Sequence, residues 1–276
     1  MKTGAKRRAT QGFFAGGVIG GIGGLIGLGG AEFRLPVLKG LFKLPTLEAI
    51  IFNKAMSLVV VATALLARSS GIEWSSLFAQ WPIAVNLLAG SLIGAWFAAG
   101  VAMRVKATTL DRLVFFLLVG LAFVMITEHV FNLHWLGGAL IDDGPLRWVV
   151  GLVAGLVIGI VAAVLGVAGG ELLIPTITIL YGIDIKLAGS LSLAISLPTM
   201  LVGFARYSQS GSFGVLGREK PLFFSMTAGS FVGAVLGGLA IGLVATNWLI
   251  IGLAVILLIS AYKTFQHSKA DAKNPA

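Results

Sequence analysis

Eight apolar stretches, separated by short polar or charged segments, run along the chain. They lie near residues 12–30, 45–67, 81–103, 110–128, 148–168, 186–205, 221–244 and 247–265. A helix needs about 20 mainly apolar residues to cross a hydrocarbon core roughly 30 Å thick, and each stretch approaches or reaches that length. The pattern therefore predicts an all-α polytopic membrane protein.

The eight stretches form two sets of four, because the chain repeats itself at an offset of 139 residues. Residues 12–36 return without a gap at 151–175, with ten of 25 positions identical, and the run 89–95 returns at 228–234. Duplicated hydrophobic halves are typical of membrane transporters. We therefore expect two transmembrane repeats within one integral membrane domain, residues 1–138 and 139–276.

Composition agrees with a membrane location and removes several other classes of protein. The chain is 57% hydrophobic and 11% charged, with 38 glycines and a mean hydropathy of +0.98, whereas a soluble domain is about 25% charged. It has no cysteine and three scattered histidines, so we expect no disulfide, no metal site and no cofactor. The net charge of +9 comes from bases spread over loops, which is unlike a nucleic-acid-binding face.

The loop charges distinguish two topologies, because positive residues in short loops prefer the cytoplasm. If all eight stretches cross, the loop with Lys39 and Lys43 faces outside and the acidic segment 128–147 faces inside. In the second topology each repeat opens with a re-entrant hairpin, broken by glycines at 27–31 or 166–170, and then crosses three times. The basic loop then faces inside and the acidic segment faces outside, as expected for positive residues. We therefore predict two inverted repeats with both termini in the cytoplasm. The copy of the first segment in the second half indicates that it is retained rather than cleaved as a signal peptide.

Two glycine-rich motifs that end in proline mark the two breaks, GLGGAEFRLP at 27–36 and GVAGGELLIP at 166–175. Together they resemble the twin motifs of the TauE/SafE sulfite exporter family, and the resemblance covers almost the whole chain. It implies a multi-pass permease of the cell inner membrane, not an enzyme, that moves sulfite, sulfoacetate or other organosulfonates, usually outward. This chain departs from the family pattern in two ways. The often-glycine positions hold Ala31 and Ala168, and two often-apolar positions hold Glu32 and Glu171.

A broken helix at membrane depth predicts a binding site, because unpaired backbone groups are tolerated there only inside protein or beside a watery cavity. Each expected hairpin has a first helical leg before its glycine break and a second helical leg after it. The second legs, which begin near Gly30 and Gly169, would also present free N–H groups to an anion. The expected substrate site combines the breaks with polar residues of the helices that follow. It comprises Gly29, Gly30, Ala31, Glu32, Asn53, Lys54, Ser57, Gly169, Gly170, Glu171, Ser192, Ser196 and Arg206.

Ionisable residues inside a membrane cost about 2.5–3.5 kcal/mol each on insertion scales and are functional candidates. Here they are Glu32, Arg34, Lys54 and Glu171. Lys54 could bind the anion, pair with Glu32 or Glu171, or extend to the membrane interface. Its repeat mate, the residue 139 positions away, is Leu193. The two glutamates recur in both halves, so they could carry a coupling proton or stabilise the start of each second leg.

Polar residues on the following helices have two interpretations. Asn53 and Ser57, with their counterparts Ser192 and Ser196, could form interhelical hydrogen bonds or contact the substrate. Glycines at four-residue spacing in the first stretch of each half predict close helix packing.

These features predict a secondary transporter of small sulfur-containing anions that works by alternating access and could be coupled to protons. Arg68 and Arg206 end equivalent helices and are expected at opposite mouths, as interface anchors or as anion-recruiting charges. An anion channel is one alternative. A membrane-embedded enzyme acting on lipid phosphate is another, although that chemistry needs more clustered carboxylates and arginines, or a metal. The expected partners are the anion and the lipid bilayer, not nucleic acid, and the sequence leaves a homodimer open.

Overall fold

The computed structural model describes residues 2–44, 46–68, 71–101, 116, 119–120, 123, 126–127, 139–165, 168–208, 217–245, 247–249, 251–256, 258–259 and 262. Within these ranges every regular element is a helix. In chain order they are α1 (Lys2–Ile26), α2 (Ala31–Gly40), α3 (Thr46–Arg68), α4 (Trp74–Ala79), α5 (Trp81–Val101), α7 (Pro145–Leu165), α8 (Gly170–Tyr181), α9 (Ile185–Ser208), α11 (Lys220–Leu239) and the 3-10 turn η2 (Ala240–Gly242). A further apolar helix covers Asn247–Ile256.

Six of these helices are long and apolar enough to cross a membrane, namely α1, α3, α5, α7, α9 and α11. Large apolar side chains are exposed on their outer faces, among them Phe14, Leu66, Phe97, Phe224 and Leu236. Such a belt would be unstable in water but suits a lipid environment. The prediction of an all-α, multi-pass membrane protein is confirmed for the described residues. The predicted stretch 110–128 lies largely outside them.

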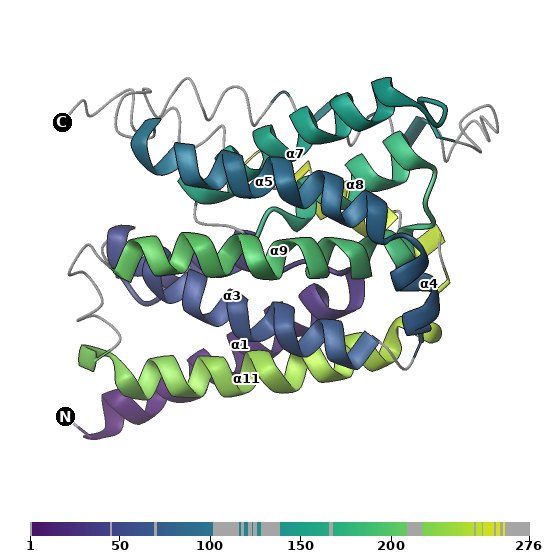
Figure 1. Cartoon of the computed structure of the whole chain (residues 1–276). Helices are drawn as coiled ribbons and strands as arrows, with labels where there is room; N and C mark the ends of the chain where they lie inside the picture. The colour runs from purple at the N-terminus through teal and green to yellow at the C-terminus, as the bar shows by residue number, and fades with distance from the viewer. Residues whose placement is uncertain are drawn as a thin grey trace.

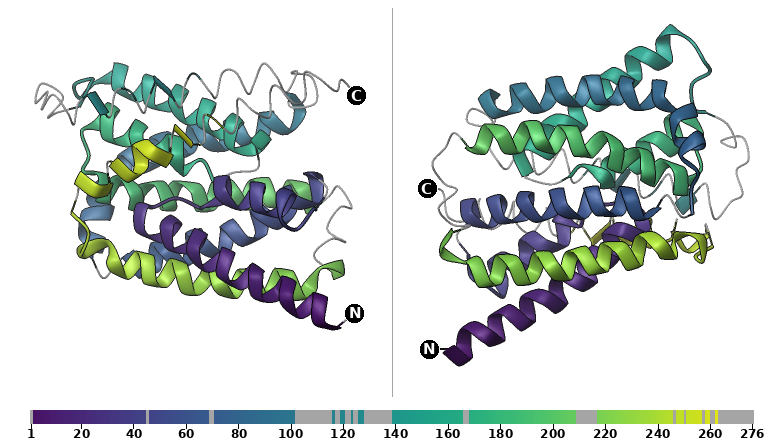
Figure 2. Two further views of the ribbon diagram at one scale, coloured as in Figure 1. Left: turned by 180° about the vertical axis from the view of Figure 1, so that it is seen from behind. Right: turned by 60° about the horizontal axis from the view of Figure 1, so that its bottom comes forward.

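The helices pack into two bundles that do not follow the order of the chain (Figure 1). The first bundle contains α1, α2, α3 and α11, and the second bundle contains α5, α7, α8 and α9. They meet where α3 lies against α9, and the right view of Figure 2 shows these two helices between α5 and α11. Under the 139-residue offset, each helix of one bundle corresponds to a helix of the other. Each bundle therefore contains one helix, α11 or α5, from the other half of the sequence.

Glycines allow these exchanged helices to pack closely. A Cβ added at Gly20 of α1 would overlap the backbone of Ser230 in α11, and one added at Gly159 of α7 would overlap the backbone of Ser91 in α5. Gly20 and Gly159 are repeat mates, and so are Ser91 and Ser230. The predicted glycine packing face is therefore confirmed, and the two helix pairs pack in the same register.

The equivalent helices α3 and α9 run in opposite directions. Arg68, the last residue of α3, donates hydrogen bonds to Lys186 and Ser190 near the start of α9. The end of one helix thus lies beside the start of its counterpart, and Figure 1 shows the two side by side. These directions are the ones that inverted repeats require, while their placement across a bilayer stays a prediction.

The chain turns back at the two glycine breaks, which we name the first tip (residues 27–30) and the second tip (residues 166–169, of which Ala168 and Gly169 are described). Gly27 and Gly30 have φ values of +97° and +66°, and Gly169 has +78°. Residues with a Cβ rarely adopt these values. The helix boundaries agree with the predicted breaks, since α1 ends and α2 begins on either side of the first tip.

Each short helix returns to the level at which its hairpin began. Phe42, just after α2, lies beneath Arg8 of α1, with 6.0 Å between the guanidinium carbon and the ring centroid, and Arg8 Nη2 donates to the Phe42 carbonyl at 3.0 Å. In the second half the repeat mates Arg147 and Tyr181 stack in the same way at 5.5 Å. Both ends of each hairpin therefore lie at one end of the molecule. Re-entry of the hairpins into a bilayer stays a prediction.

Candidate functional site

The two tips touch each other where the bundles meet. A Cβ added at Gly29 in the first tip would overlap the Cβ of Ala168 in the second tip. A Cβ added at Gly170 would lie 3.3 Å from the carbonyl oxygen of Gly27 and 3.3 Å from the Cα of Leu28. The two helix breaks are thus in direct contact, and the structure holds them closed against each other.

A fully buried arginine, Arg34 of α2, fixes the first tip to α3. Its Nη1 donates to the Oγ of Ser57 at 2.7 Å and to the Oδ1 of Asn53 at 3.3 Å, and its Nη2 donates to the Gly29 carbonyl at 3.3 Å. Asn53 also donates from Nδ2 to the Ala31 carbonyl at 3.0 Å. Asn53 and Ser57 therefore form interhelical hydrogen bonds around a positive charge, which is one of their two interpretations. Contact with substrate is the other and is not tested by these bonds.

Serine hydroxyls of α9 donate to carbonyl groups of both tips. Ser196 of α9 donates to the Ala168 carbonyl in the second tip at 2.8 Å, and Ser192 of the same helix donates to the Gly27 carbonyl in the first tip at 3.4 Å. Leu173 occupies the position equivalent to the buried arginine of the first half. Each tip thus has a side-chain donor for one of its carbonyl groups, and the buried arginine is a donor to the first tip.

Lys54 of α3 extends from the first bundle to the second. The residue is 5% exposed, and its Nζ lies 3.5 Å from the carbonyl oxygen of Ala163, near the C-terminal end of α7. A cation is favoured there because the last carbonyl groups of a helix lack intrahelical partners. This burial contradicts the interpretation that Lys54 extends to the membrane interface. Anion binding and pairing with a glutamate stay predictions.

Glu171 places a buried carboxyl group next to the second tip. It lies in the first turn of α8 and is 5% exposed. Gly169 precedes this turn in a left-handed conformation, and its carbonyl oxygen accepts hydrogen bonds from the N–H groups of Leu172 and Leu173 at 3.1 and 2.9 Å. The helix dipole stabilises an acidic side chain at this position, which fits the structural role. Proton transfer is not tested by the geometry.

The structure brings the predicted site residues of α2, α3, α8 and α9 together around the contact between the tips. The side chains of two predicted residues, Glu32 and Arg206, lie outside the described part of the chain. Both therefore stay predictions.

Arg68 corrects one expectation, because it is not an anchor at a mouth. It is 1% exposed, and its guanidinium donates to the carbonyl oxygens of Gly24, Leu25 and Lys186 at 3.0, 2.7 and 2.6 Å, and to the Oγ of Ser190 at 2.9 Å. The carbonyls of Gly24 and Leu25 belong to the last turn of α1, where they lack helical partners. Arg68 therefore fixes the end of α1 to the start of α9.

Sequence reasoning identified Arg34 as an intramembrane charge without assigning its contacts, and it assigned no role to Arg147. Arg34 was recognisable as an intramembrane charge, but its role as the link to Asn53 and Ser57 depends on contacts that no spacing indicates. Arg147 was recognisable from the repeat, because Arg8 stands 139 residues before it and both precede a glycine-rich first leg. The repeat offset of 139 residues, applied to charged as well as apolar positions, indicates that Arg8 and Arg147 are equivalent.

The described helices define a multi-pass membrane protein in which two helix breaks meet beside buried charges. The chain belongs to the Sulfite exporter TauE/SafE family, which it matches over residues 12–264. This family implies a membrane permease that exports sulfite or related sulfur-containing anions, and its members are transporters rather than enzymes. No curated protein and no solved structure matches the chain.

Proposed function

We propose that this protein exports sulfite or an organosulfonate such as sulfoacetate, and that the substrate binds between the two tips. One observation carries the proposal: both helix breaks meet at the boundary of the two bundles, beside buried positive charge. The family supports the class of substrate. The geometry around the tips supports the position of the site.

Arg34 and Lys54 make the first-bundle side of the tips attractive to an anion. Each charge lies inside protein, where its loss of hydration is costly and an opposite charge offsets part of that cost. The short helices α2 and α8 also begin at the tips, after Gly30 and Gly169, so their positive dipole ends lie at the same place. A sulfite or sulfonate group, with three oxygens and a negative charge, accepts hydrogen bonds from such an arrangement.

Passage of the substrate requires the tips to separate. We infer that the moving units are the two bundles rather than the two halves of the sequence, because α11 packs with α1 and α5 packs with α7. Rocking of one bundle against the other about the contact of α3 with α9 then opens the tips alternately to the two sides of the membrane.

Glu171 is the proposed carrier of a coupling proton, with Glu32 as its counterpart in the first half. Glu171 is buried beside the second tip, so its protonation state changes the charge that an arriving anion meets. A neutral carboxyl group favours anion binding and a charged one opposes it. Proton and anion therefore bind together and leave together in this scheme.

The proposed location is the cell inner membrane, with both termini in the cytoplasm and the second half inverted relative to the first. The basic residues at the start of α1, Lys2, Lys6, Arg7 and Arg8, support a cytoplasmic N-terminus. The arrangement of α3 and α9 supports the inversion.

Lys54 provides the test of the proposed site. In proteoliposomes with purified protein, saturable sulfite transport should fall about tenfold or more in Lys54→Ala, because a hydrogen bond to a charged group contributes about 1.5–3 kcal/mol. The matched control is Lys6→Ala, which removes an exposed positive charge from the start of α1 and should transport like the wild type. Normal sulfite transport by Lys54→Ala would overturn the site between the tips.

The same vesicles separate a transporter from an anion channel. A transporter saturates with sulfite and is stimulated by substrate on the opposite side of the membrane. Flux that rises linearly with the gradient, without such stimulation, would instead support the channel.

A further inference from the structure

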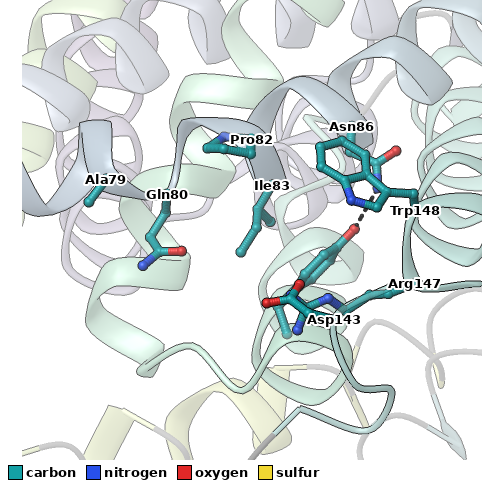
Figure 3. Close-up of a pocket in the computed structure, with 9 residues that line it drawn as sticks. Ala79, Gln80, Pro82, Ile83, Asn86, Asp143, Arg147 and Trp148 are labelled. Atoms are coloured by element: carbon teal, nitrogen blue, oxygen red, sulfur yellow. Dashed lines mark hydrogen bonds and ion pairs between the residues drawn. The ribbon is translucent and has the colours of Figure 1, made fainter. Parts of the chain in front are cut away.

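A cavity opens beside the N-terminal ends of α5 and α7 (Figure 3). Its volume is about 210 Å³, whereas one water needs only about 10–15 Å³, so a small organic anion fits. Its polar lining consists of Gln80, Asn86, Asp143, Arg147, Trp148 and Tyr181. The tips lie at the other end of α7, and the 21 residues of that helix separate the two places by roughly 30 Å at 1.5 Å per residue. The cavity is therefore distinct from the proposed substrate site.

Arg147 brings a positive charge to this cavity. Its side chain is 16% exposed and forms an ion pair with Asp143, whose side chain is 84% exposed. Arg147 also lies in the first turn of α7, where the helix dipole is positive and an arginine adds to that charge. Because Asp143 is almost wholly in solvent, an anion inside the cavity can replace it at the guanidinium.

Neutral hydrogen-bonding groups complete the lining. The Nδ2 of Asn86 donates to the hydroxyl oxygen of Tyr181 at 3.0 Å, which leaves the tyrosine proton available to donate to a ligand. Figure 3 shows Gln80 on one side of the cavity and Asp143 with Arg147 on the other. An oxyanion bound at Arg147 thus has amide and hydroxyl donors around it.

At the equivalent place in the first half, the arginine has different charged neighbours. There the repeat mate of Arg147 is Arg8, and its Nη2 lies 3.8 Å from the Oε2 of Glu219. The repeat mate of Glu219 is Gln80, an amide without charge. At this repeat position the first half has a carboxylate near its arginine and the second half has a neutral amide, and the ion pair of Arg147 is with the exposed Asp143 instead. This difference is expected where one end binds an anion and the other does not.

We propose that the cavity between α5 and α7 is a second anion-binding site, which takes a small organic sulfonate or a related oxyanion at Arg147. On the proposed orientation it lies on the outer side of the membrane, where an exported anion leaves. That the bound anion is the transported one rests on the proposed function, whereas binding at Arg147 does not.

Calorimetric titration of the purified full chain with methanesulfonate tests the proposal. Arg147→Gln should weaken methanesulfonate binding about tenfold or more, because a charge-assisted hydrogen bond is lost. Gln80→Glu should weaken it to a similar extent without loss of thermal stability, because the same pairing already exists between Arg8 and Glu219. Asp143→Asn removes the competing carboxylate and should strengthen binding by up to about fivefold.

Arg8→Gln is the matched control, because Arg8 does not line the cavity, and it should leave methanesulfonate binding unchanged. Unchanged binding in both Arg147→Gln and Gln80→Glu would overturn the proposal, and so would an equal loss in Arg8→Gln. Titration of Lys54→Ala separates the two sites. Methanesulfonate binding should persist in that variant and remain sensitive to Arg147→Gln, whatever happens to its sulfite transport.

Discussion

At the scale of single residues, charge is where the two halves differ most. Three pairs of repeat mates show it: Lys54 and Leu193, Arg34 and Leu173, and Glu219 and Gln80. Glycines and hydroxyl residues at the tips and packing faces are shared more closely between the halves. The shared residues maintain the common backbone, while the charged residues make the two halves different.

Arg68 gives a stability prediction at this scale. Arg68→Met should lower the free energy of unfolding by about 3 kcal/mol, because the carbonyl oxygens of Gly24, Leu25 and Lys186 lose their charged donor. Equilibrium unfolding in mixed micelles measures the change. Arg8→Met removes a partly exposed arginine and should change the free energy by less than about 1 kcal/mol. Equal effects of the two substitutions would show that the buried hydrogen bonds of Arg68 do not stabilise the fold.

At the scale of elements, the main feature is the exchange of α5 and α11 between the bundles. Each of these helices packs in close register against the first leg of the other half, through glycines on both partners. Helix association in lipid depends on such close packing, because lipid chains are as apolar as the side chains and water adds little driving force. The two exchanged pairs therefore contribute strongly to holding each bundle together.

Gly20 and Gly159 test the importance of this packing. Gly20→Ala and Gly159→Ala should each destabilise the protein by about 1–3 kcal/mol, because the new methyl group meets the backbone of Ser230 or Ser91. Thermal unfolding of the purified variants measures the effect. Gly242→Ala is the control, because no atom lies within 4 Å of the added Cβ. Gly20→Ala and Gly159→Ala should also lower the stability by similar amounts. A large difference between them would contradict the equivalence of the two helix pairs.

At the scale of the whole molecule, the starts of α1 and α7 lie at opposite ends. The first hairpin opens and closes at the end that holds Arg8 and Phe42, and the second at the end that holds Arg147 and Tyr181. Figure 1 shows the N-terminus far from α4, which leads into α5 beside the start of α7. This arrangement supports the prediction that the two repeats are inverted.

Single cysteines test the orientation, because the natural chain contains none. Lys6→Cys and Trp148→Cys place thiols at exposed positions near the starts of α1 and α7. A membrane-impermeant maleimide added to intact cells should label Trp148→Cys, and should label Lys6→Cys only after the cells are opened. Both variants must first retain sulfite transport. Labelling of the two thiols from the same side would exclude the inverted arrangement and favour eight full crossings.

The sequence predicted what depends on local pattern and repetition. The breaks at 27–31 and 166–170 fall where α1 and α7 end, and Gly27, Gly30 and Gly169 adopt positive φ values there that residues with a Cβ rarely take. The partners of α5 and α11 were not predictable, since a glycine face shows that a helix packs closely but not against which helix. The role of Arg68 was predicted wrongly for the same reason. Its position at a helix end is visible in the sequence, whereas its contact with Lys186, in another bundle, is not.

The exchange of α11 also affects the order of events while the protein is made. The helix α1 emerges from the ribosome well before its packing partner, because its glycine face packs against residues 220–239. At about 5–20 residues per second, translation of the intervening chain takes roughly 10–40 s. During that time the nascent first helix has only lipid or the insertion machinery against its packing face. Completion of the first bundle therefore waits until α11 has been synthesised.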